Sequence, residues 1–270
     1  MASADDGPGP ALGEIEFLAR SHNRVRVLDA LTDGPLGRYE LEDATGVARA
    51  TLGRILDDFE ERGWISEAER TYRHTQLGAY VAREMKTVLE RFEPVPDLNE
   101  VAQWFPEDGF EFDLASLAGA TVVRSSTGNA LAPTAHIASR IREADHVRLI
   151  TYSVLPGVVH ECWQGTVEGD LDLESVFDRR AIESFGTDQR TLEEAREILE
   201  TGTPVYVVSG EVPTTIFVVD DAVLLCLSGG EGAPLAVIET EHDAVLAWAE
   251  STIDERRAAG KRVDPSLFTG

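Results

Sequence analysis

The stretch RYELEDATGVARATLGRILDDFEERGWISEAERTYRHT, residues 38–75, decides the fold of the first third of this 270-residue chain. Its middle carries apolar residues at the spacing of one helix face: Leu52, Ile55, Leu56 and Phe59. This spacing predicts an amphipathic helix over Ala48–Arg62. Gly63 is suited to end it, because glycine readily takes the left-handed conformation found at helix C-termini.

A shorter helix is expected just before this one, at Tyr39–Ala44, with a break at Gly46 between the two. After Gly63 the sequence Gly63-Trp64-Ile65, an arginine-bearing loop and Thr75-Gln76-Leu77 indicate two short strands joined by a turn. The predicted order is therefore helix, turn, helix, strand, loop, strand.

This order resembles the winged helix-turn-helix of prokaryotic transcriptional regulators. In that fold the second helix enters the major groove with its N-terminal residues against the base edges, and the wing lies on the backbone or in the minor groove. The resemblance implies base contacts by Arg49, Ala50, Thr51 and Arg54. It implies phosphate contacts by Arg38, Tyr39, Arg70, Tyr72 and Arg73. Surface ion pairs with the abundant Asp and Glu side chains remain an alternative for each arginine.

Two residues of the expected recognition helix depart from helix preferences. Ala48 stands at the N-cap, where a Ser or Thr would contribute about 1 kcal/mol. Gly53 lies in the helix interior and costs about 1 kcal/mol relative to Ala. Gly53 either permits a close approach to DNA or is simply tolerated, and the sequence leaves both open.

Helical patterns flank this motif on both sides. Glu14–Leu31 has an apolar face and ends at Gly34-Pro35. Gly78–Phe92 carries an apolar stripe of Val81, Met85, Val88 and Phe92. Such a stripe is usually core, but after a winged helix it also serves as a dimer contact, so we expect a homodimer. We place a disordered lead at 1–13 and the DNA-binding domain at 14–93.

The charge is the main difficulty for a DNA-binding role, because a chain of net charge −25 should be repelled by phosphates. Residues 1–93 hold 12 basic and 18 acidic side chains, so half of the 24 basic residues lie there. Only Lys86 and Lys261 are lysines, and all other basic residues are arginines. Acidic excess with scarce lysine resembles proteins of extreme halophiles, in which carboxylates keep the surface hydrated and salt screens their repulsion. A generic acidic protein that binds cations or basic partners is the alternative.

Other bulk features favour a cytoplasmic location. No apolar run approaches the ~18 residues of a membrane span, so we expect no membrane partner. The start, MASADDGPGPALGE, lacks the basic and apolar regions of a signal peptide. Cys162 and Cys226 do not form a disulfide framework, which favours a reducing compartment.

After residue 93 the composition changes. Prolines and glycines punctuate an expected linker over residues 94–112. Strand and helix patterns then alternate, which predicts an α/β domain over 113–258 and a tail over 259–270. The expected strands are Thr121–Val123, His146–Tyr152, Leu173–Phe177, Val205–Ser209, Thr215–Val219, Ala222–Leu227 and Leu235–Ile238. The expected helices are Thr134–Ala144, Thr191–Thr201 and Asp243–Ala258.

The segments AHIASRIREADHVRLITYS (135–153) and TPVYVVSGEVPTTIFVVDDAVLLCLS (203–228) resemble one repeat of the phospholipase D-like fold. That family uses an HxKxxxxD motif, which at the matching spacing falls on Pro213, Thr215 and Asp220. Proline offers no nucleophile and threonine no positive charge for phosphate, so the resemblance implies a domain without phosphodiesterase activity.

The domain also resembles the ligand-sensing regions of archaeal TrmB-like regulators. It is more similar still to the middle domain named for the methanogenesis regulatory protein, which is widespread in haloarchaeal winged-helix proteins. The segment GEGAPLAVIETEHDAVLAWAESTIDERR, residues 230–257, carries most of this likeness. If the fold holds, ligands bind at the C-terminal ends of the strands. The candidate effector contacts there are Tyr152, Ser153, Asp178, Arg179, Arg180, Thr214, Thr215 and Ser228.

Arg179 and Arg180 suit an anionic effector. Pairing with Glu174, Asp178 or Glu183 is an equally open alternative. His160-Glu161-Cys162 is a weak metal signal without a second cluster, so no metal and no cofactor are expected. Cys226 is expected to be a buried small hydrophobe.

The sequence therefore predicts a cytoplasmic, dimeric, sequence-specific DNA-binding transcriptional regulator with a non-catalytic sensing or dimerisation domain. One alternative is a hydrolase of the phosphodiesterase type with a winged-helix adaptor. It lacks support because no nucleophilic or paired-carboxylate constellation emerges. The other is an acidic interaction module that no longer binds DNA, against which the placed arginines argue.

Overall fold

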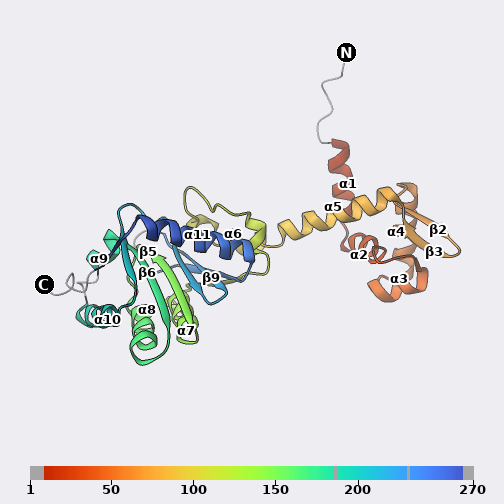
Figure 1. The fold of residues 1–270 in the computed structure, drawn as a ribbon. Helices are drawn as coiled ribbons and strands as arrows, with labels where there is room; N and C mark the ends of the chain where they lie inside the picture. Colours follow the sequence, from red (N-terminus) through yellow and green to blue (C-terminus); the bar gives the residue numbers. More distant parts are fainter. Residues whose placement is uncertain (1–8, 185–187, 230–231, 264–270) are drawn as a thin grey trace, which may run out of the picture. The chain divides into compact units, whose positions relative to one another are not determined.

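The computed structural model describes residues 9–184, 188–229 and 232–263. The chain forms two compact units, residues 1–92 and residues 93–270 (Figure 1). Residues 1–8 of the expected lead and 264–270 of the expected tail lie outside the described residues. No helix within the described ranges is long and apolar enough to cross a membrane.

The first unit has the winged helix-turn-helix order that the sequence predicts. Its three-stranded antiparallel sheet has the order β1-β3-β2. The elements are α1 (Gly9–Ala19), α2 (His22–Ala30), β1 (Leu36–Gly37), α3 (Arg38–Thr45), α4 (Arg49–Glu61), β2 (Ile65–Ala68), β3 (Thr71–His74) and α5 (Gln76–Phe92).

The single helix expected over Glu14–Leu31 is instead two helices. Ser21 is extended and begins α2, so the chain changes direction between α1 and α2. This break lets Phe17 of α1 reach the rings of Phe59 and Trp64, at centroid distances of 6.2 and 5.7 Å. Residues 9–13, expected in the disordered lead, belong to α1.

Local backbone geometry fixes the turn and the wing. Gly46 closes α3 in the left-handed region, with φ of 61°, which costs glycine no steric strain. At the tip of the wing Glu69 and Arg70 both have positive φ, 50° and 66°, as a tight hairpin turn requires. This turn directs the strands β2 and β3 into an antiparallel pair.

The second unit is built on an eight-stranded mixed sheet of order β11-β7-β6-β5-β8-β9-β10-β4. The pairs β5–β6 and β6–β7 are parallel, and every other neighbouring pair is antiparallel. The strands are β4 (Thr121–Arg124), β5 (His146–Thr151), β6 (Asp172–Asp178), β7 (Val205–Val208), β8 (Thr215–Val219), β9 (Ala222–Leu227), β10 (Ala236–Thr240) and β11 (Lys261–Arg262). The helices are α6 (Val95–Asn99), α7 (Ala132–Arg142), α8 (Pro156–Trp163), α9 (Arg179–Ser184), α10 (Gln189–Glu200) and α11 (Asp243–Ala259).

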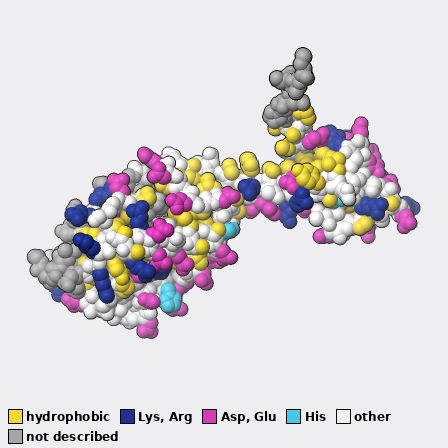
Figure 2. All heavy atoms as spheres, turned by 45° about the horizontal axis from the view of Figure 1, so that its top comes forward, with side chains coloured by type: hydrophobic (Ala, Val, Ile, Leu, Met, Phe, Trp, Pro, Cys, Tyr) yellow, Lys and Arg dark blue, Asp and Glu magenta, His cyan; other side chains and the backbone are white. Residues whose placement is uncertain are grey.

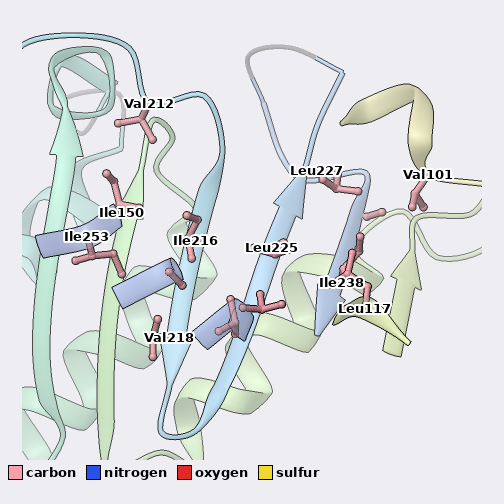
Figure 3. Close-up of a cluster of buried hydrophobic side chains, with 14 of the residues drawn as sticks. Val101, Leu117, Ile150, Val212, Ile216, Val218, Leu225, Leu227, Ile238 and Ile253 are labelled. Carbon is pink, nitrogen blue, oxygen red and sulfur yellow. The ribbon is translucent and has the colours of Figure 1, made fainter. Parts of the chain in front are cut away.

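Alternating residues of the central strands fill two separate cores, because side chains of a strand point to opposite faces in turn. On one face Ile150, Ile216 and Leu225 pack with Ile253 of α11 (Figure 3). On the other face Leu149, Phe217 and Leu224 pack with side chains of α7, α8 and α10. The sheet is therefore the middle layer of three, which explains why β8 and β9 are buried along their whole length.

Residues 95–112, expected to be a linker, instead belong to the second unit. Leu98 of α6 and Val101 are buried in the core that contains α11. Phe110 and Phe112 stack on each other with ring centroids 5.1 Å apart, and both contact Trp248. Burial of these apolar groups holds the segment on the domain. At the other end β11 lies within the expected tail and pairs with β7.

Candidate nucleic-acid interface and effector site

Helix α4 presents one face to the core and the opposite face to solvent. Its four predicted apolar residues are buried among the core of the first unit. The four residues predicted to contact bases, Arg49, Ala50, Thr51 and Arg54, are all exposed. No side chain caps the helix start at Ala48, as the sequence indicates. The amphipathic pattern thus orients the candidate base-reading side chains outward.

The five candidate arginines of the interface have no ion-pair partner in the described part of the chain: Arg38, Arg49, Arg54, Arg70 and Arg73. Other arginines of the same unit do pair. Arg24 contacts Asp58 at 3.1 Å, and Arg62 contacts Glu14 at 3.1 Å. Acidic side chains are abundant over the visible surface of both units (Figure 2). The ion-pair alternative therefore has no support for these five within the part of the chain that the structure describes.

Gly53 leaves room for one of these guanidinium groups. A Cβ atom at Gly53 would lie 2.8 Å from Nη2 of Arg38, which is closer than van der Waals contact. The start of α3 thus places Arg38 directly over the outer side of α4. The sequence left the role of Gly53 open, and the structure relates it to the position of Arg38.

The two candidate tyrosines differ. Tyr39 is 79% exposed at the start of α3, as a phosphate contact requires. Tyr72 is only 8% exposed and packs into the core of the first unit. Burial, followed by the charge of Glu67, raises the pKa of Tyr72. The expected phosphate contact of Tyr72 is therefore not supported, because alternation along β3 turns Tyr72 inward and Arg73 outward.

In the second unit the strand directions bring the candidate effector residues to one edge of the sheet. Tyr152 follows β5 and Asp178 ends β6, and these two strands are parallel. Strand β8 is antiparallel to β5, so Thr215 begins at the same edge. Strand β9 returns to this edge, where Ser228 follows it.

These residues largely satisfy one another. The hydroxyls of Thr151 and Thr215 are 2.9 Å apart, and Tyr152 hydrogen-bonds to Ser228. Asp178, 2% exposed, accepts hydrogen bonds from Nε of Arg180 at 3.0 Å and from the amide of residue 181 at 2.9 Å. The site is thus a preformed polar network.

The two adjacent arginines of this edge behave differently. Arg180 pairs with Asp178, one of the partners that the sequence left open, and lies 6.0 Å from the ring centroid of Tyr152. Glu174 pairs instead with Arg148 and Arg257. The side chain of Glu183 lies outside the described part of the chain. Arg179 is exposed.

The positions that match the phospholipase D-like motif are spread along β8. Pro213 and Thr215 lie at its start, and Thr215 is engaged by Thr151. Asp220 lies beyond its other end, where its carboxylate accepts hydrogen bonds from the amides of Asp145 and His146 at 3.2 and 2.9 Å. Asp220 therefore fixes the start of β5 and holds the β8–β9 turn with a positive φ of 50°.

The stretch His160-Glu161-Cys162 contributes to packing and ion pairs. His160 Nδ1 lies 2.8 Å from Glu194, and Glu161 pairs with Arg142 at 2.6 Å. Burial raises the pKa of the Cys162 thiol to about 12, which keeps it protonated. Within the described residues no group of His, Cys, Asp or Glu side chains is arranged to hold a metal ion.

The sequence patterns did not predict a cavity in the second unit. A cavity of about 60 Å³ lies between the sheet and helices α8 and α10, and Ser153 is the one effector candidate that lines it. Its other lining residues include Leu149, Ser175 and Phe177. Leu173, Ser175 and Phe177 alternate along β6 and therefore share one face of the strand. A hydroxyl on this otherwise apolar face is the sequence pattern that could have indicated the cavity.

Two family models match the chain. Residues 12–95 match the HVO_A0261 N-terminal domain, and residues 130–259 match the middle domain of the methanogenesis regulatory protein FilR1. No curated protein matches it.

Several solved structures are similar. TrmBL2, described as an archaeal chromatin protein with a novel mode of DNA binding, is 14% identical with a TM-score of 0.41 over 93% of this chain and 99% of its own. Nuc, a phospholipase D family member from Salmonella typhimurium, is 18% identical with a TM-score of 0.42 over 53% of this chain and 97% of its own. The repressor BigR from Xylella fastidiosa is 24% identical with a TM-score of 0.26 over 30% of this chain and 87% of its own. The chain therefore joins an HVO_A0261 N-terminal domain to a domain of the FilR1 middle-domain family, which is named for a methanogenesis regulatory protein.

Proposed function

We propose that this protein is a sequence-specific DNA-binding transcriptional regulator. The observation that carries the proposal is a set of five arginines at the start of α3, along α4 and on the wing of a strongly acidic protein. None of the five has an ion-pair partner among the described residues. Free guanidinium groups at these three places match the geometry in which a helix reads a major groove while its flanks hold phosphates. The match of residues 130–259 to a domain of a regulatory protein supports the same reading.

We assign base contacts to Arg49, Ala50, Thr51 and Arg54. An arginine donates two hydrogen bonds to guanine, and a threonine contacts a thymine methyl or a base edge. Phosphate contacts are assigned to Arg38, Tyr39, Arg70 and Arg73. Tyr72 is left out because it is buried.

A homodimer is part of the proposal. Helix α5 exposes a row of large apolar side chains, of which Phe92 is 66% exposed and Leu89 lies beside it. A second copy of α5 would bury this row, and two half-sites would then contact DNA. Sedimentation of the full chain with Leu89→Glu/Phe92→Glu tests this. A dimer that persists unchanged in the double variant would contradict an α5 interface.

We propose adaptation to high salt as the origin of the acidic surface. Screening by salt weakens repulsion among the carboxylates and between the protein and DNA. Counterion release contributes little at high salt, so affinity rests on base contacts and dimerisation. We expect the unfolding midpoint to rise with KCl and DNA binding to survive in molar KCl. Loss of binding along a steep salt dependence would contradict this proposal.

The second unit is proposed to be a non-catalytic sensing domain within the cell. The polar network at the sheet edge, formed by Tyr152, Asp178, Arg180, Thr215 and Ser228, is the candidate effector contact. Arg179, Ser153 and Thr214 lie at the same edge and are retained as candidates. A phosphodiesterase is disfavoured because the motif positions hold Pro213 and Thr215, and Asp220 serves a turn. Cleavage of a phosphodiester by the full chain, abolished by a substitution in the network, would favour the enzyme.

A gel shift in high KCl tests the DNA proposal, with a duplex selected from a random pool by the wild type. The variant Arg49→Ala/Arg54→Ala should lose this binding. The matched control Arg20→Ala/Arg83→Ala removes the same charge from arginines that are ion-paired and lie outside α4, so it should bind normally. Equal binding by both double variants would contradict base reading through α4, and a wild type that selects no duplex would favour the acidic interaction module that no longer binds DNA.

A further inference from the structure

The cavity beneath α8 and α10 has walls suited to an uncharged ligand. Its lining is mostly aliphatic and aromatic, with Leu149 and Phe217 from the sheet, Val158 from α8 and Ile198 from α10. No Asp, Glu, Lys, Arg or His is among its lining residues in the described part of the chain. Burial keeps the Cys162 thiol, which also lines it, in its neutral form. A charged ligand would lose its hydration without gaining a partner.

One polar group in this cavity lacks a partner. Ser175 is 3% exposed on β6, and its hydroxyl has no hydrogen-bond partner among the described residues. The neighbouring Thr151 hydroxyl, by contrast, donates to the carbonyl of Ser153 and contacts Thr215. Buried hydroxyl groups are nearly always hydrogen-bonded, so Ser175 marks the place where a ligand's polar atom would be held.

The size of the cavity limits the ligand. A cavity of roughly 150 Å³ holds benzene, so about 60 Å³ accommodates roughly two or three non-hydrogen atoms. We propose that the cavity binds a short-chain alcohol or carbonyl compound, with its oxygen at Ser175 and its carbon chain between Leu149, Val158 and Ile198. This site lies on the opposite sheet face from Tyr152 and Ile150. It adjoins the polar network at Thr151, which lines the cavity and contacts Thr215.

Binding in this cavity would give the proposed sensing domain its effector. Only the regulatory role of the bound compound rests on the proposed function. Occupancy of the cavity is a property of the second unit and is measured without DNA. A protein that binds the probe but not DNA would contradict the proposed function and leave the cavity assignment intact. A protein that binds DNA but not the probe would overturn only the cavity assignment.

The probe is ethanol, titrated into the full chain with labelled Ile, Leu and Val methyl groups observed by NMR. We expect saturable shifts confined to methyl groups that line the cavity, such as those of Leu149 and Ile198. Ethylammonium has the same number of non-hydrogen atoms as ethanol and a charge, so it should produce no such shifts. Shifts that are absent, that do not saturate, that spread over both units, or that are equal for the two probes would overturn the proposal.

Two variants test the named contacts. Ser175→Ala keeps the apolar walls and should weaken ethanol binding roughly 3- to 10-fold, the worth of one neutral hydrogen bond. Ala195→Ile places a larger side chain in the cavity and should abolish binding. Ala258→Ile makes the same change at an exposed position of α11 and should bind as the wild type. Unchanged affinity in Ser175→Ala would contradict the assigned polar contact, whether or not Ala195→Ile folds.

Discussion

Substitution of Gly53 by alanine separates stability from DNA binding in α4. Glycine in a helix interior costs about 0.5–1 kcal/mol relative to alanine, so Gly53→Ala should stabilise the first unit by up to this amount. The new Cβ would meet only Nη2 of Arg38, the end of a flexible side chain, at 2.8 Å. The guanidinium would have to retreat by roughly 1 Å to reach normal contact.

If Arg38 holds a phosphate from its position over α4, that retreat weakens a charge-assisted hydrogen bond. Such a bond is worth about 1.5–3 kcal/mol, so its complete loss in Arg38→Ala corresponds to roughly 10- to 100-fold in affinity. Gly53→Ala should lie between the wild type and Arg38→Ala. The expected result is a protein that is more stable and yet binds DNA less tightly.

The assay pairs urea unfolding with fluorescence anisotropy on a selected duplex. Gly13→Ala is the matched control, because a Cβ at this helical glycine of α1 meets nothing within 4 Å. In the Arg38→Ala background, Gly53→Ala should cause no further loss. Wild-type affinity in Gly53→Ala, or an equal loss with and without Arg38, would refute the argument that Gly53 positions Arg38.

Three further predictions concern the first unit. Gly78→Ala should strongly destabilise it in thermal unfolding, because the Cβ would lie 1.8 Å from the backbone oxygen of Trp64; a midpoint at or above that of the wild type would contradict this packing. Burial lowers the pKa of His74 below 6.5 despite its hydrogen bond to a backbone carbonyl of α2, so the folded unit favours the neutral ring. The contribution of the neutral His74 ring to the free energy of unfolding should therefore be fully present above pH ~6.5. It should fall by at most ~1.4 kcal/mol per pH unit as the pH drops, and His74→Gln should remove this part of the acid loss in urea titrations. Tyr72→Phe should leave DNA affinity unchanged while Arg73→Ala lowers it in anisotropy titrations; equal effects would restore Tyr72 as a contact.

The strands were predictable where a single chemical signal dominated. Strands β8 and β9 have the expected bounds, because continuous apolar runs are interrupted by Asp220-Asp221 at the turn. Helix α4 was predictable from its apolar spacing and from Gly63. Helix α8 was not expected, because residues 156–163 combine a proline, a histidine and an acidic residue in an apolar context. Its burial depends on tertiary contacts with α7 and α10, which no local pattern encodes.

The candidate sites were predictable to different degrees. The exposed side of α4 follows from helix periodicity, so the orientation of Arg49 and Arg54 was accessible. Tyr72 was assigned to the wing by composition, although period-two alternation from Arg73 places it inside. Which arginines pair with acids depends on distances between elements, and the sequence left this open. That the Ser175 hydroxyl has no partner among the described residues is likewise a property of three-dimensional packing.

Helix α4 is proposed to read base sequence through two exposed arginines, Arg49 and Arg54. The direct measurement is the ratio of affinities for the selected duplex and a shuffled duplex, by anisotropy at one KCl concentration, for the wild type and Arg49→Ala/Arg54→Ala. Each bidentate contact discriminates by about 1–3 kcal/mol, so losing two should reduce this ratio at least ~30-fold. We expect this fall, with only the lesser, sequence-independent part of binding retained. An unchanged ratio would contradict it.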